Sequence, residues 1–146
     1  MSPNFRHGDY LLANSLAYVS SVPRRGDVVV LRTPFDSGKE YVKRIIGLPG
    51  EHLRIEGERV IIDGRMLDEP YVDAVSEKPV TPGNQWILED GQYFVMGDNR
   101  QVSMDSRYFW PVDRSFIRGK VWFRYWPLGR LGLVKAQRPC FRTSQV

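Results

Sequence analysis

The chain has 146 residues, of which 42% are hydrophobic and 26% charged, and its formal net charge is +4. These values are typical of one soluble globular domain and exclude a disordered chain. No apolar run approaches the roughly 18 residues of a membrane-spanning helix, so we expect no transmembrane anchor within these residues. The single Cys140 excludes an internal disulfide, and His7 and His52 stand alone, so no metal or other cofactor is expected.

The predicted elements are short β-strands, because runs rich in Val, Ile and aromatic residues recur between Gly, Pro and Asp. In chain order they cover residues 10–13, 27–32, 41–46, 52–55, 59–62, 85–88, 92–96 and 120–126. Only residues 113–117 suggest a helical turn, which Asp113 could cap. We therefore expect a mostly β fold, with short-stranded antiparallel sheets that form a partly open, barrel-like domain.

A hairpin and loop insertion is expected between residues 52 and 84. Asp63-Gly64 predicts a type I′ turn and Glu56-Gly57-Glu58 another tight reversal, so residues 52–67 should form a meander. Residues 68–84 contain three prolines and no sustained periodicity, which predicts a long surface loop. The expected domain covers residues 1–132.

Positive charge is concentrated at the carboxyl end of the chain. Residues 114–146 contain eight Lys or Arg and no acidic residue, whereas the first 113 residues carry 13 basic and 17 acidic side chains. Such a segment can attract anionic lipid or nucleic acid, at about 1 kcal/mol per basic residue near a charged membrane. For residues 133–146 we favour a solvated, partly frayed basic tail.

Lys43 lies in an apolar strand. An ordinary lysine has a pKa near 10.4 and is protonated at neutral pH, but burial disfavours the ammonium form and can turn the amine into a base. On a strand, Tyr41, Lys43 and Ile45 share one face. If that face is the inner one, Lys43 is desolvated; if it is the outer one, Lys43 is a surface charge, and the local sequence alone favours the surface.

Two longer segments carry the strongest functional signal: Tyr41–Glu51 (YVKRIIGLPGE) and Gly97–Arg107 (GDNRQVSMDSR). The tetrapeptide Gly-Asp-Asn-Arg alone would indicate only a turn, but the following Ser-x-Asp-Ser-Arg at fixed spacing makes the pattern specific. Both segments resemble signature boxes of the type I signal peptidases, serine endopeptidases that use a lysine as general base. The resemblance extends from Met1 to about Gly132.

This resemblance implies roles for individual residues. The match of residues 41–51 reverses the local preference for the surface, so Lys43 would be a buried general base. The hydroxyl of Ser103 would hydrogen-bond its nitrogen and orient it. Structural charges that hold the loop around the site through ion pairs would be Asp98, Asp105 and Arg107. Asn99 and Ser106 would satisfy turn geometry.

The nucleophile is expected directly ahead of Met1. The family's nucleophile box reads Ser-Met-x-Pro-Thr-Leu-x-x-Gly-Asp, and this sequence opens Met1-Ser2-Pro3-Asn4-Phe5. Ser2 is displaced by two residues, roughly 6–7 Å along an extended chain, which is too far for a catalytic pair. The chain as it stands is therefore predicted to be inactive. Asn4-Phe5 in place of Thr-Leu, and Trp110 where the family commonly has Gly, are further departures.

The function implied is removal of N-terminal signal peptides from exported proteins, at the extracytoplasmic face of the plasma membrane. The partners would be signal peptides, bound as an extended strand with one edge at residues 36–41, and the membrane surface. An alternative is a non-catalytic soluble relative that binds extended peptides. A third possibility is a nucleic-acid binder, based on three basic residues and interleaved aromatics between Arg118 and Trp126. Those aromatics fit better at a lipid interface, so no nucleic acid is expected.

Overall fold

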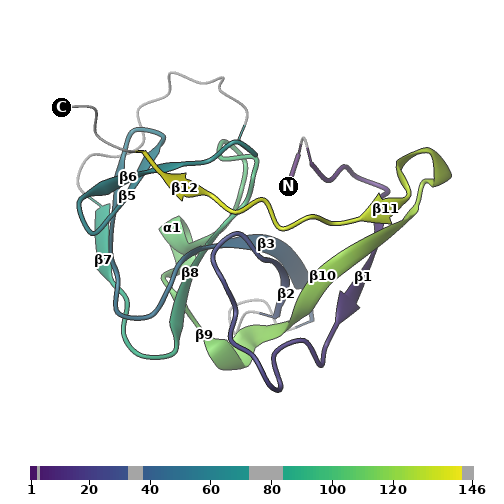
Figure 1. Ribbon diagram of the computed structural model, residues 1–146, viewed down its shortest axis with the longest axis horizontal. Coiled ribbons are helices and arrows are strands. Elements are labelled where there is room, and N and C mark those ends of the chain that lie inside the picture. Colours follow the sequence, from purple (N-terminus) through teal and green to yellow (C-terminus); the bar gives the residue numbers. More distant parts are fainter. Residues whose placement is uncertain (3, 33–37, 73–83, 143–146) are drawn as a thin grey trace.

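The computed structural model describes residues 1–2, 4–32, 38–72 and 84–142 and contains two antiparallel sheets (Figure 1). The larger sheet has the spatial order β1 (Tyr10–Asn14), β10 (Ile117–Trp126), β2 (Val28–Arg32), β3 (Glu40–Gly47), β8 (Gln92–Met96) and β9 (Val112–Asp113), and β11 (Gly132–Leu133) also pairs with β10. The smaller sheet has the order β12 (Cys140–Phe141), β6 (Arg65–Asp68), β5 (Arg59–Ile62), β4 (His52–Glu56) and β7 (Asn84–Ile87). The expected mostly β fold is confirmed, and within the described residues neither sheet closes into a barrel.

Each predicted strand is present, with small shifts at its ends. The meander at 52–67 forms β4, β5 and β6, and Asp63 and Gly64 have φ of 49° and 77°, as a type I′ turn requires. The predicted helical turn is the 3-10 helix η1 (Arg114–Phe116), but the side chain of Asp113 makes no capping hydrogen bond. Most of the loop expected at 68–84, and the start of the edge expected at 36–41, lie outside the described residues.

The strands β3 and β8 are buried on both faces, because each separates two hydrophobic clusters. Ile46 of β3, with Phe94 and Met96 of β8, packs against the smaller sheet. Ile45 of β3 and Val95 of β8 point to the other side, into a cluster with residues of β2 and β10. The buried side chains of β3 and β8 are therefore shielded from water on both faces of the sheet.

As far as residue 142, the segment after β11 is not the frayed tail that we favoured from the sequence. Figure 1 shows this segment crossing from β11 on the larger sheet to β12 on the smaller one. There β12 pairs with β6, with Phe141 opposite Leu67, and the Phe141 ring lies 4.6 Å from the guanidinium carbon of Arg65 and 5.3 Å from that of Arg25. Backbone pairing and cation–π contacts thus tie residues 133–142 to both sheets.

No helix in the described ranges is both long and apolar enough to cross a membrane. The single α-helix among them, α1 (Ser106–Phe109), has one turn and was not predicted from the sequence. It begins after Asp105, whose carboxylate accepts a hydrogen bond from the backbone N–H of Arg107. A four-residue helix carries too little periodicity to be detected, so its cap is its only local signal.

Candidate active site

Lys43 lies on the inner face of the larger sheet, as the match of residues 41–51 implied, and not at the surface position that the local sequence alone favours. Ile45, two residues along β3, is fully buried in the second cluster, and Tyr41 packs against that same cluster. Lys43 shares this face and is only 8% exposed. Strand alternation and the burial of both faces of β3 therefore place the Lys43 side chain in the interior, with its amine 5.8 Å from the centre of the Tyr41 ring.

The amine of Lys43 contacts the hydroxyl of Ser103, 60 residues away in the sequence. Lys43 Nζ lies 2.9 Å from Ser103 Oγ, and both side chains are buried. Burial lowers the pKa of Lys43 from its ordinary value; the carboxylate of Asp105 opposes this shift and the guanidinium of Arg107 adds to it. A lysine with a lowered pKa and a hydroxyl that fixes its direction can accept a proton from a third group.

Asp105 and Arg107 hold the loop that carries Ser103. The carboxylate of Asp105 is fully buried; it accepts hydrogen bonds from the Gly97 backbone N–H at 3.0 Å and from Arg107 Nε at 2.8 Å. Arg107 Nη2 also donates to the backbone oxygen of Arg100 at 2.8 Å. These charge-assisted bonds join both ends of the 97–107 loop.

Asp98 binds the residue that follows the lysine. Its two carboxylate oxygens accept hydrogen bonds from Arg44 Nε and Nη2 at 2.9 and 2.8 Å, in a bidentate pair that is almost completely buried. Asn4 Nδ2 donates to the same carboxylate at 2.8 Å. Arg44 and Asp98 thereby fix β3 against the end of β8.

Two residues at the site were not found by sequence reasoning. Glu69 forms a buried ion pair with Arg100 at 2.6 Å, and its carboxylate also accepts a hydrogen bond from the Tyr71 hydroxyl at 2.7 Å. Glu69 lies in a stretch without periodicity, so nothing local pointed to it. Asn4 was noted only as a departure from the expected threonine, although its amide reaches Asp98.

Two further residues considered from the sequence, Ser2 and Asn99, lie next to Asp98. Both line a pocket there, and no hydrogen bond joins Ser2 to Lys43. Met1 contacts the start of the 98–101 segment: its sulfur accepts a hydrogen bond from the Asp98 backbone N–H at 3.5 Å. Desolvation lowers the pKa of the Met1 amino group, the charge of Asp98 opposes this and that of Lys43 adds to it.

Comparison with known proteins agrees with this geometry. The family model described as signal peptidase, peptidase S26, matches residues 1–126. The chain belongs to the signal peptidase family S26. A probable signal peptidase I-2 from Synechocystis sp. is 37% identical over 140 residues, which cover 92% of this chain and 62% of that protein. Signal peptidase IB from Staphylococcus aureus is 32% identical over 142 residues, or 87% of this chain and 73% of that protein.

A solved structure shares the signal peptidase fold. The crystal structure of a signal peptidase I from Enterococcus faecalis V583 matches with a TM-score of 0.60 and 32% identity, covering 68% of this chain and 97% of the other. The chain spans 62% of the length of the Synechocystis relative. The matched part includes both Lys43 and Ser103.

Proposed function

We propose that this chain is the catalytic domain of a signal peptidase I that removes N-terminal signal peptides from exported proteins. The observation that carries the proposal is the buried contact of 2.9 Å between Lys43 Nζ and Ser103 Oγ. In this proposal Lys43 takes the proton of a serine hydroxyl as that oxygen attacks the scissile carbonyl, and later activates the water that releases the acyl-enzyme. Ser103 orients the amine and does not attack.

The proposal places the nucleophilic serine directly ahead of Met1. Support comes from Met1 itself, whose amino group is close enough to Lys43 for the lysine charge to lower its pKa. A residue joined to that nitrogen is the one that we propose to meet the amine. Ser2, by contrast, faces the pocket beside Asn99.

Substrate is proposed to bind as an extended strand along β3. The strand β2 pairs with β3 from Glu40 to Arg44, whereas β8 pairs with it only from Arg44 onward. An extended signal-peptide segment added on the β8 side, ahead of Arg44, would gain main-chain hydrogen bonds and lead directly to Lys43.

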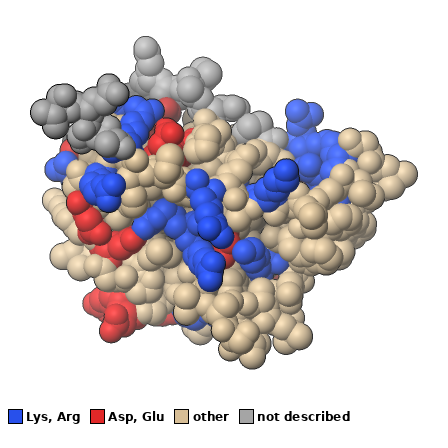
Figure 2. Space-filling model, viewed as in Figure 1, with Lys and Arg blue, Asp and Glu red and all other residues tan. Residues whose placement is uncertain are grey.

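We also propose that the domain rests on the membrane through the end formed by β1, β10 and η2 (Leu128–Arg130). Figure 2 shows the tip of this end, at the right, as a projection free of charged side chains, with a group of Lys and Arg at its base. Its exposed apolar residues, from 42% to 69% accessible, are Tyr10, Leu12, Trp122, Tyr125, Trp126, Leu128, Leu131 and Leu133. Trp and Tyr favour the lipid–water interface, and an extracytoplasmic position beside the membrane would bring the site to its substrates.

The test of the proposed reaction uses a chain extended by a serine and its preceding strand ahead of Met1. We expect it to cleave a peptide after small residues at a signal-peptide end, and Lys43→Ala to reduce kcat by at least about 10³-fold. The matched control is Lys135→Ala, at an exposed lysine, which should leave the rate unchanged. The unextended chain should be inactive. Comparable cleavage by the unextended chain, or by the Lys43→Ala variant, would contradict the proposal and favour a different nucleophile or base.

A non-catalytic, peptide-binding role is the alternative that this experiment separates. In that case the extended chain would bind the peptide and leave it intact. The lowered pKa of Lys43 supports the catalytic role over the binding role, because a desolvated amine destabilises the fold and has no use in a purely structural site.

A further inference from the structure

Glu69 lies outside both segments that resemble known sequence boxes, yet it contacts one of them. It directly follows β6 of the smaller sheet, and its carboxylate binds Arg100, 31 residues later, at 2.6 Å. The side chains of Arg100 and Glu69 are only 6% and 8% exposed. Charges buried to this degree are costly unless they are paired, so this ion pair belongs to the interior. The proposed chemistry gives it no part.

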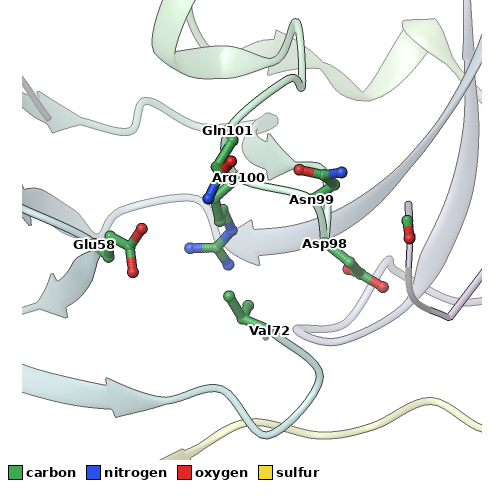
Figure 3. Close-up of a pocket in the computed structure, with 7 residues that line it drawn as sticks. Glu58, Val72, Asp98, Asn99, Arg100 and Gln101 are labelled. Carbon is green, nitrogen blue, oxygen red and sulfur yellow. The ribbon is translucent and has the colours of Figure 1, made fainter. Parts of the chain in front are cut away.

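Arg100 connects Glu69 to Gly97. Its Nη2 atom binds the carboxylate of Glu69, and its Nε atom donates a hydrogen bond of 3.1 Å to the backbone oxygen of Gly97. Figure 3 shows the Arg100 side chain extending from the loop after β8, with Asp98 on one side and Glu58 on the other. The guanidinium group is planar and rigid, so a carboxylate that holds its Nη2 also fixes the direction of its Nε–H.

The backbone of Gly97 borders the reactive groups directly. A Cβ atom placed on Gly97 would lie 2.2 Å from Ser103 Oγ and 3.7 Å from Lys43 Nζ. The N–H of Gly97 donates to the carboxylate of Asp105 at 3.0 Å, and its C=O accepts from Arg100. Loss of either hydrogen bond would therefore allow Gly97 to shift against the hydroxyl that contacts the amine.

A second contact joins Glu69 to the opposite face of β3. The Tyr71 hydroxyl donates to the same carboxylate oxygen at 2.7 Å, and the Tyr71 ring centre lies 4.1 Å from the guanidinium carbon of Arg44. Arg44 points away from Lys43, because successive residues of a strand face opposite sides of the sheet. The contact through Tyr71 therefore supports β3 on the far face, whereas the contact through Arg100 reaches the side of the amine.

We propose that Glu69 is a positioning residue, which acts through Arg100 on the backbone of Gly97. Gly97 in turn keeps the Ser103 hydroxyl against the Lys43 amine. The inference deepens the proposed function and rests on it for the reaction that this alignment serves. The smaller sheet, to which Glu69 belongs, thereby takes part in aligning groups carried by the larger one.

The first measurement needs no cleavage. In the chain of 146 residues, the NMR titration midpoint of the Lys43 side chain is compared between wild type and Glu69→Gln, which keeps the size of the side chain and removes its charge. A loosened Arg100 would let Gly97 shift and admit water to the amine, which weakens the desolvation that lowers its pKa. We therefore expect the midpoint to rise towards the ordinary 10.5. The direct effect of losing a negative charge would be the reverse, because negative charge stabilises the ammonium form.

The second measurement is kinetic and uses the serine-extended chain. We expect Glu69→Gln to lower kcat by about tenfold and to change KM by less than about twofold, because it misaligns the amine and leaves the peptide-binding edge intact. The double variant Glu69→Gln, Arg100→Met removes both charges of the pair, a replacement that is often neutral for stability. It lacks the donor to Gly97, so it should match Glu69→Gln in both midpoint and kcat.

The matched control is Glu51→Gln, at a glutamate whose carboxylate also binds an arginine, Arg25, in a largely buried pair. It should leave both the midpoint and kcat unchanged. Asp105 and Arg107, whose charges act on Lys43, are the same in all of these variants. A rise in the midpoint that is confined to the Glu69 variants is therefore the signature of positioning.

An unchanged or lowered midpoint in Glu69→Gln would overturn the positioning role, as would an equal rise in Glu51→Gln or a double variant with the wild-type midpoint. The proposed function fails separately, if the serine-extended wild type does not cleave. The titration midpoints would then still decide whether Glu69 aligns the amine.

Discussion

Gly97 and Ser103 approach each other so closely that a Cβ atom at position 97 would lie 2.2 Å from Ser103 Oγ. No residue larger than glycine fits at position 97, because the Ser103 hydroxyl that contacts Lys43 occupies the volume that a side chain would need. This contact joins the end of β8 to the loop that carries Ser103, and it sets the position of the orienting hydroxyl.

Gly97→Ala should therefore displace Ser103 and misalign the Lys43 amine. In the serine-extended chain we expect kcat to fall by about 100-fold, since a misplacement of about 1 Å can cost this much. Peptide-cleavage kinetics measure the effect. Gly129→Ala is the control, because no atom lies within 4 Å of a Cβ placed there. Unchanged kinetics for Gly97→Ala would show that the position of Ser103 does not matter.

Lys43→Met should stabilise the fold at neutral pH by roughly 0.5–2 kcal/mol, because it removes a desolvated amine from an apolar site. The folded-state pKa of Lys43 lies below the unfolded value near 10.5, so between these values the unfolded state binds more protons and the wild-type stability rises with pH. The advantage of Lys43→Met is thus largest below the folded-state pKa and shrinks towards pH 10.5.

Urea unfolding at several pH values measures this difference. The exposed Lys135→Met serves as the control and should change the unfolding free energy by less than about 0.5 kcal/mol at every pH. A Lys43→Met variant that is less stable than wild type at neutral pH would mean that the amine is stabilised by its surroundings.

Trp110 stores backbone strain just after α1. Its φ of 71° and ψ of 170° lie in a region that is essentially restricted to glycine, while its side chain is 69% exposed and gains little from packing. We expect Trp110→Gly to raise the unfolding free energy by about 1 kcal/mol, the strain relief less the added unfolded-state entropy. Trp110→Ala keeps the Cβ and should give no such gain. Equal effects of the two substitutions in thermal unfolding would refute the strain.

Phe141 anchors the carboxyl-terminal segment to the smaller sheet. Phe141→Ala removes the ring between Arg25 and Arg65 and should lower the unfolding free energy by about 1–3 kcal/mol. Leu128→Ala, at a position that is 69% exposed, should change it by less than about 0.5 kcal/mol. Similar small effects of both in chemical unfolding would indicate that the segment contributes little to stability.

The sequence predicted the strands and the meander well, because apolar alternation and turn residues such as Asp63-Gly64 act locally. Local alternation alone could not place Lys43, since the burial of that side chain depends on β8 and the second sheet, which come later in the chain; only the match of residues 41–51 indicated it. The path of residues 133–142 was missed for a related reason: a two-residue strand such as β12 leaves no periodic signal, and its pairing with β6 depends on the tertiary fold.

The candidate site was predictable only in part. Lys43 and Ser103 were found through their resemblance to known boxes, and nothing in the spacing of 60 residues would otherwise have joined them. Glu69 and its ion pair with Arg100 stayed hidden, because isolated acidic residues in irregular segments are usually solvated.

The amine of Lys43 is held in a buried site where it loses its proton more readily than an ordinary lysine. NMR titration of the Lys43 side chain, followed through its Cε and Nζ resonances, tests this directly. We expect a midpoint clearly below the ordinary 10.5 and below that of the exposed Lys135 in the same sample. A midpoint for Lys43 at or above that of Lys135 would show that burial does not make Lys43 a base.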